Sequence, residues 1–234
     1  MLRRNLFSSL FAAAGALALA ACGGEGGATS PGAEAGGGAG GSVAIYEYDA
    51  RPSDMVLGDP NAPVTIVEYA SVTCPHCANF HATTFKPLKE KYIDTGKVKF
   101  VFREFPTAPA QLAVAGFLLA RCAADNTNDE AYFTMLDALF RKQRDWIGPN
   151  ARDELLQMSA AVGLNQQQFE TCVQNEEEVD RLRQDIEHAS NTYEITGTPT
   201  FLVNGEKKQI FTIEQFDEVL APLLGEEPEA LPSE

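Results

Sequence analysis

Two cysteines separated by two residues, Cys74 and Cys77, constrain the fold of this chain of 234 residues more than any other feature of its sequence. The run 64–70 before them is rich in β-branched residues and predicts a strand, and residues 75–92 predict a helix. Pro75 would take the first helical position, where its missing N–H costs nothing. A Cys-x-x-Cys pair between a strand and a helix is typical of a redox site.

The start of a helix carries partial positive charge, which stabilises a thiolate, so we expect Cys74 to be the nucleophile. A thiol with a pKa of about 8.5 is only about 3% ionised at pH 7. A helix terminus contributes up to about 2 kcal/mol, or about 1.5 pKa units, which leaves Cys74 roughly half ionised. A strongly oxidising site needs more, and His76 is the candidate for the additional stabilisation.

A structural zinc site is the main alternative for this motif, and it normally needs four ligands. The chain has no second Cys-x-x-Cys, and His76 and His81 could at best complete a cramped site. We therefore expect neither a metal nor any other cofactor.

Cys122 and Cys172 form the better structural pair. A bridge within the four-residue motif would contribute about 2 kcal/mol, whereas a Cys122–Cys172 bridge, which closes a much longer loop, would contribute about 4 kcal/mol. An oxidising compartment would favour that disulfide. Two buried free thiols are the alternative.

The first 21 residues predict a secretion signal, because Arg3 and Arg4 precede a run of apolar or small residues over 6–21 that is short for a membrane span. The run ends in Leu-Ala-Ala-Cys and resembles the lipobox of bacterial lipoproteins, which implies a lipid on Cys22. Ordinary cleavage that leaves Cys22 as a spare thiol is the alternative. Residues 22–53 would then form a lipidated, flexible Gly/Ala-rich tether.

The remaining sequence predicts one domain over residues 54–224, followed by an acidic tail over 225–234. Alternation over 98–102 predicts a second strand with one buried face, and strand–helix–strand order predicts parallel pairing. A helical block is expected over about 107–193. Asn204-Gly205 predicts a hairpin turn, and Thr212 with Gln215 predicts the start of a last helix. The formal charge of −15 argues against a nucleic-acid binder.

Over about residues 54–224 the chain resembles the thioredoxin superfamily, and within it the DsbA-like thiol:disulfide oxidoreductases. The resemblance rests on Cys74-Pro75-His76-Cys77, on Gly58–Tyr69 before it, and on Gly197-Thr198-Pro199-Thr200. It implies an α/β thioredoxin-like fold, βαβ plus ββα, with an inserted helical domain.

The resemblance also implies roles for individual residues. Cys74 would exchange with substrate, Cys77 would resolve the mixed disulfide, and His76 would tune the potential. The Thr198–Pro199 bond would be cis, with the Thr198 backbone pairing with the substrate. An ordinary trans proline is the alternative.

Glu68 shares a strand face with Val64, Ile66 and Ala70, which would bury its carboxylate beneath the motif. The family uses an acidic residue at this offset for proton transfer with the buried cysteine. An exposed strand glutamate is the alternative. We expect His81 and His188 to be solvated helix residues without a role in catalysis.

We expect a monomeric oxidase of exported proteins with cysteine pairs, reoxidised by a DsbB-like quinone-linked membrane protein. It would act in the periplasm or another extracytoplasmic space and would touch a membrane through its lipid only. A reductase or isomerase is the alternative, because Thr198 occurs before the proline in isomerase-like relatives, although no segment resembles a dimerisation domain. A metal-handling thioredoxin-like binding module is the third interpretation.

Overall fold

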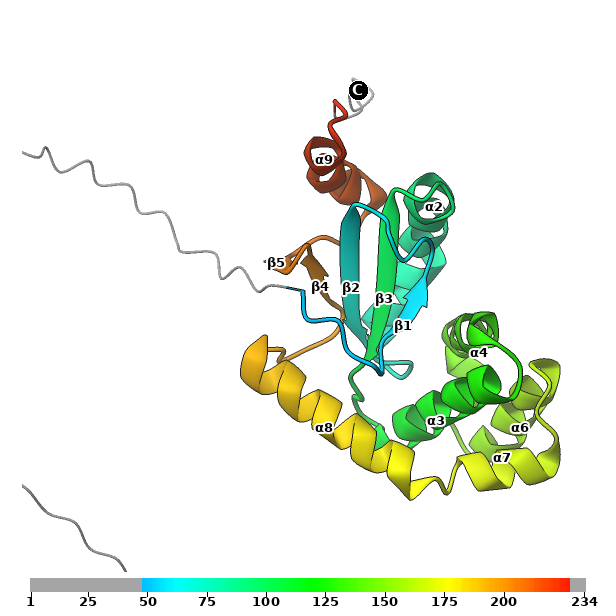
Figure 1. The fold of residues 1–234 in the computed structure, drawn as a ribbon. Helices are drawn as coiled ribbons and strands as arrows, with labels where there is room; N and C mark the ends of the chain where they lie inside the picture. The colour runs from blue at the N-terminus through cyan, green and yellow to red at the C-terminus, as the bar shows by residue number, and fades with distance from the viewer. Residues whose placement is uncertain (1–47, 228–234) are drawn as a thin grey trace, which may run out of the picture. The chain divides into compact units, whose positions relative to one another are not determined.

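A five-stranded mixed sheet organises the protein in the computed structural model, which describes residues 48–227. The strand order is β1-β3-β2-β4-β5 (Figure 1). Strands β2 and β3 are parallel, as predicted, and the other neighbours are antiparallel. The strands are β1 (Met55–Leu57), β2 (Val64–Ala70), β3 (Val98–Glu104), β4 (Thr200–Val203) and β5 (Glu206–Lys208).

Both faces of the sheet are covered, which corrects the prediction of one buried face for the second strand. Every residue of β2 is buried, and in β3 only Lys99 is partly exposed. Val67, Val101 and Tyr69 pack with Ala189 and Tyr193 on one face. Parallel strands are normally packed against other elements on both faces. The alternation in one strand therefore does not reveal the elements that bury its second face.

The first helical segment crosses from β2 to β3 and is not a regular α-helix throughout. It contains α1 (Pro75–Phe80), a π-helical stretch (His81–Phe85), α2 (Lys86–Leu88) and a second π-helical stretch (Lys89–Ile93). The irregular stretches flank Pro87, which lacks the N–H needed for a regular helical bond. Phe80 packs on Phe201 of β4 with ring centroids 4.8 Å apart, which fixes the helix on the sheet.

A block of helices lies between β3 and β4 in the sequence, and Figure 1 shows most of it gathered at one end of the sheet. The last helix, α9, lies near the opposite end of the strands. A disulfide joins Cys122 of α3 to Cys172 of α7, with Cα atoms 6.0 Å apart. The helices are α3 (Ala110–Asn126), α4 (Asp129–Arg141), α5 (Gln143–Trp146), α6 (Ala151–Ala161), α7 (Gln166–Cys172), α8 (Glu176–Thr192) and α9 (Ile213–Leu224).

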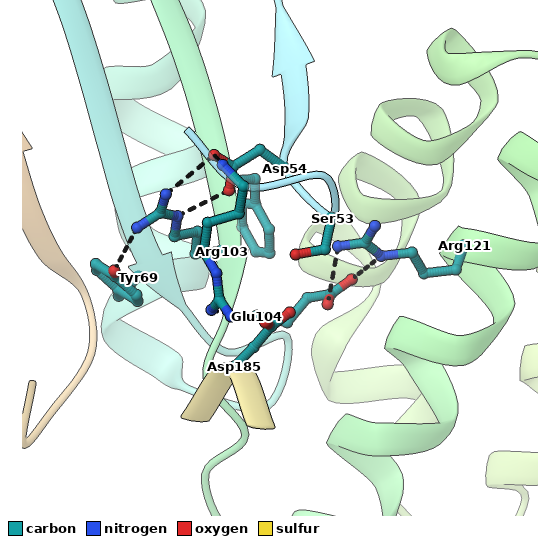
Figure 2. Close-up of a pocket in the computed structure, with 9 residues that line it drawn as sticks. Ser53, Asp54, Tyr69, Arg103, Glu104, Arg121 and Asp185 are labelled. Carbon is teal, nitrogen blue, oxygen red and sulfur yellow. Dashed lines mark hydrogen bonds and ion pairs between the residues drawn. The ribbon is translucent and has the colours of Figure 1, made fainter. Parts of the chain in front are cut away.

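A buried carboxylate at the end of β3 connects the sheet to this helical block. Glu104 binds Arg121 of α3 at 2.7 Å (Figure 2). It also binds Arg181 of α8 at 2.7 Å and accepts a hydrogen bond from Tyr132 of α4. Although burial opposes ionisation, the two guanidinium groups hold the pKa of Glu104 below its usual range. The neighbouring Arg103 binds Asp54 at 2.8 Å. These pairs fix the end of β3 against three helices.

The predicted signal peptide, Cys22 and most of the predicted tether lie outside the described residues, as does most of the acidic tail. Within residues 48–227, none of the helices has both the length and the apolar character that crossing a membrane requires.

Candidate active site

Cys74 is the residue that caps the start of α1, directly after the turn that follows β2. Its backbone N–H donates to Ser71, and its carbonyl accepts from Ala78, so the first helical turn forms around it. The side chain of Gln143, from α5 in the helical block, donates to the carbonyls of Val72 and Cys74 at 2.9 and 3.0 Å. The helical block therefore holds the cysteine turn directly. Sequence reasoning missed Gln143, because a glutamine inside a predicted helix carries no sign of its distant partner.

The segment before β4 lies against the Cys74 sulfur. The Thr198–Pro199 peptide bond is cis, and the Cys74 sulfur lies 3.4 Å from the Thr198 carbonyl oxygen. The Thr198 hydroxyl is buried and has no hydrogen-bond partner among the described residues. That hydroxyl is therefore available to donate to an ionised sulfur.

The environment of Cys74 favours its thiolate. A hydrogen bond from the Cys77 thiol, the Thr198 side chain, and the backbone N–H groups of Cys77 and His76 lower the pKa of Cys74 to about 5, against the opposing effect of burial. This pKa is lower than a helix terminus alone could produce. His76 contributes through its backbone N–H, while its side chain is exposed.

Cys77 has the opposite environment. Its side chain is fully buried, whereas Cys74 retains 7% of its surface. Burial, the neighbouring Cys74 and the charge of Glu68 all raise the pKa of the Cys77 thiol. Both cysteines carry free thiols in the structure. The pair therefore consists of an outer sulfur that favours the thiolate and an inner sulfur that favours the protonated thiol.

Glu68 lies on the β2 face that packs against α1, and none of its side chain is exposed. One carboxylate oxygen bonds His81 at 2.9 Å, and the other has no partner in the described part of the chain. The structure thus places a buried carboxylate beneath the motif and excludes the exposed alternative.

His81 corrects the expectation of a solvated helix residue, because only 9% of its side chain is exposed. It stacks on Phe140 of α4, with ring centroids 4.0 Å apart. A signal was present in the sequence: His81 follows Cys77 by four positions, on the helix face that also carries Thr84 and Leu88, both buried. His188 is partly exposed and pairs with Asp49.

A groove of about 360 Å³ opens beside the cysteine turn. Phe211, 47% exposed, forms part of its wall and is one of two large exposed apolar side chains among residues 48–227. No three His, Cys, Asp or Glu side chains in the described ranges gather to hold a metal ion. The groove is lined by His76, Asn79, Phe80, Thr198, Pro199 and Phe211.

The sequence model of the family described as thioredoxin matches residues 50–221. The chain belongs to the thioredoxin family. Within that family it is DsbA-like, and the crystal structure of Wolbachia pipientis alpha-DsbA1 is similar to it, with a TM-score of 0.69 and 33% identity. The match covers 75% of this chain and 93% of the Wolbachia protein. The α/β fold with its inserted helical region is confirmed.

Other relatives carry related names. A Rickettsia conorii protein named "Putative protein-disulfide oxidoreductase RC0029" is 35% identical over 78% of this chain, which spans only 64% of that relative's length. BdbD from Bacillus subtilis has the same fold, with a TM-score of 0.66 and 24% identity over 78% of this chain and 99% of its own. The Rickettsia relative thus carries the name of a disulfide oxidoreductase, and BdbD shares the fold of this DsbA-like chain.

Replacing Thr198 by Val tests the assigned environment of Cys74. The variant keeps the shape and the backbone carbonyl but loses the hydroxyl. A hydrogen bond to a charged group contributes about 1.5 kcal/mol, so the pKa of Cys74 should rise by about one unit. Ultraviolet absorbance of the thiolate in reduced protein measures the midpoint, expected near pH 5 before substitution. A Cys74→Ser variant should show no such transition, and equal midpoints in Thr198→Val and unmodified protein would contradict the assignment.

Proposed function

We propose that this protein is a thiol:disulfide oxidoreductase that oxidises cysteine pairs of exported proteins through Cys74 and Cys77. The proposal rests on the environment of Cys74. Its sulfur favours the thiolate and lies 3.4 Å from the carbonyl oxygen of Thr198, the residue that precedes a cis proline. Stabilising the thiolate stabilises the reduced form, which makes the disulfide a stronger oxidant.

The exchange begins when a substrate thiolate attacks the Cys74 sulfur of the oxidised pair, because Cys77 is fully buried. The bond between the two cysteine sulfurs breaks, and Cys77 leaves and takes up a proton. The second substrate thiolate then attacks the substrate sulfur of the mixed disulfide. Cys74 departs as a thiolate, the better leaving group because its pKa is low. Two electrons pass from the substrate to the cysteine pair.

The groove beside Cys74 suits an extended substrate segment. Thr198 offers backbone groups next to the sulfur, and Phe211 offers an exposed apolar surface in the same groove. An unfolded chain that presents a cysteine between apolar residues would fit both features. His76 lies at the same groove, and we retain its role in tuning the potential as part of the proposal.

The direction of exchange can be tested with a reduced peptide that carries two cysteines. Oxidised protein should form one peptide disulfide per protein molecule. A Cys77→Ser variant preloaded on Cys74 with a peptide that carries a single cysteine should retain that mixed disulfide, because neither Cys77 nor a second peptide thiol is present to resolve it. Cys74→Ser is the matched control and should retain none. Rearrangement of mispaired peptide disulfides by the reduced protein, without oxidation of reduced peptide, would favour an isomerase and contradict the oxidase.

The proposal includes a place of action and partners. Cys22 follows a secretion-type sequence, so the mature protein would be held by a lipid on Cys22 at a bacterial membrane, in an extracytoplasmic space. There it would act as a monomer and be reoxidised by a DsbB-like quinone-linked membrane protein. Mass spectrometry of protein recovered from membranes should find a lipid-modified Cys22 as the first residue. Recovery of an unmodified thiol at that position would contradict the anchor.

A further inference from the structure

His81 occupies an almost closed aromatic site between the sheet and the helical block. Its ring stacks on Phe140 with an interplanar angle of 12°, and the Phe85 centroid lies 4.6 Å from its own. The rings of Phe80 and Phe102 approach it edge-on. An imidazole with two ring nitrogens is a costly choice for an aromatic site unless its polar atoms have a use.

One nitrogen of His81 bonds the buried carboxylate beneath the active cysteines. The distance from His81 Nε2 to Glu68 Oε2 is 2.9 Å, and Glu68 has no exposed surface. His81 retains 9% of its side-chain surface. His81 therefore lies between a fully enclosed carboxylate and solvent.

Several charged groups on the elements around His81 pair with one another and not with the imidazole. On α4, Asp137 pairs with Arg141 at the surface. After the first π-helical stretch, Lys86 approaches Glu90, also at the surface. On β3, Arg103 pairs with Asp54 and Glu104 with Arg121, as Figure 2 shows. Glu104 also binds Arg181 of α8 and Tyr132 of α4.

The exchange chemistry requires a proton path to Cys77. Cys77 must lose a proton to attack a mixed disulfide on Cys74, and it must regain one when it leaves. Its sulfur is fully buried, and the charge of Glu68 acts on it. Glu68 can take the proton, but it is itself enclosed, so it needs a group that reaches solvent.

We propose that His81 passes protons between Glu68 and solvent during the exchange reaction, an inference that rests on the proposed function. When Cys77 attacks, its proton moves to Glu68, and the Cys77–Cys74 bond forms as the bond from Cys74 to the substrate sulfur breaks. Glu68 then gives the proton to Nε2 of His81, and the imidazole releases a proton to water. The reverse sequence protonates Cys77 when it leaves. His81 acts through Glu68 and does not touch the reacting sulfurs.

Two substitutions separate proton transfer from packing. His81→Gln retains an amide that can donate to Glu68 but cannot relay a proton, and His81→Phe retains the aromatic stacking. His188→Gln is the matched control, because that histidine is partly exposed and pairs with Asp49. Each reduced protein is mixed with oxidised glutathione, and acid-quenched samples are analysed by mass spectrometry. The decay of the Cys74–glutathione species gives the rate at which Cys77 resolves it.

Unmodified protein and His188→Gln should resolve the mixed disulfide at rates that change little between pH 6 and 8. Both His81 variants should be at least about tenfold slower at pH 7, with rates that rise about tenfold per pH unit because hydroxide must then remove the proton. The thiolate midpoint of Cys74 should stay the same. Rates and pH profiles within twofold of the unmodified protein would overturn the inference.

If neither His81 variant folds, the unmodified protein can still refute the relay. Resolution in D₂O should be at least about twofold slower than in water at matched acidity, because protons move in the rate-determining step. Equal rates would overturn the relay. Failure of the proposed function is distinguishable, because unmodified protein would then not oxidise a reduced two-cysteine peptide at all.

Discussion

The stabilised sulfur of Cys74 is the interaction on which the account of this protein depends. The sulfur sits at the start of α1 and receives a hydrogen bond from the Cys77 thiol, with backbone N–H groups and Thr198 beside it. Each contact needs a different part of the fold: β2 delivers the turn, α1 supplies the amides, and the segment before β4 supplies Thr198. The Gln143 amide adds the helical block to this set through the Val72 and Cys74 carbonyls.

The two cysteines differ because the sheet encloses one and not the other. Cys77 faces the core above Glu68, where burial keeps its thiol protonated, whereas the Cys74 sulfur is next to the groove that Phe211 borders. A single motif therefore holds one sulfur suited to leave as a thiolate and one that requires a proton partner. In the proposed relay, Glu68 of the sheet and His81 of the first helical segment, which lie 2.9 Å apart, supply that partner.

The local features of the sequence predicted the fold well where neighbours along the chain determine the structure. The β-branched run gave β2, Pro75 marked the start of α1, and the face shared with Ile66 placed Glu68 in the core. Features that depend on residues far away in the sequence could not be predicted from local patterns. Strand β1 has three residues at an edge of the sheet, too few for a pattern.

The burial of charged side chains also could not be predicted from neighbouring residues in the sequence. In the sequence, Arg103 and Glu104 look like charged residues that end a strand in solvent. Both are buried, because Asp54 neutralises Arg103, and Arg121 and Arg181 neutralise Glu104. His81 was predicted to be solvated because a histidine in a helix usually is, although the positions around it follow a buried helix face. Its stacking partner Phe140 is almost 60 residues away in the sequence.

The midpoint potential of the Cys74–Cys77 couple, measured by equilibration with glutathione at pH 7, tests the central claim most directly. A stabilised Cys74 thiolate predicts a value more oxidising than about −180 mV. A value near about −270 mV, typical of a reducing dithiol, would contradict the claim that this site favours its reduced form.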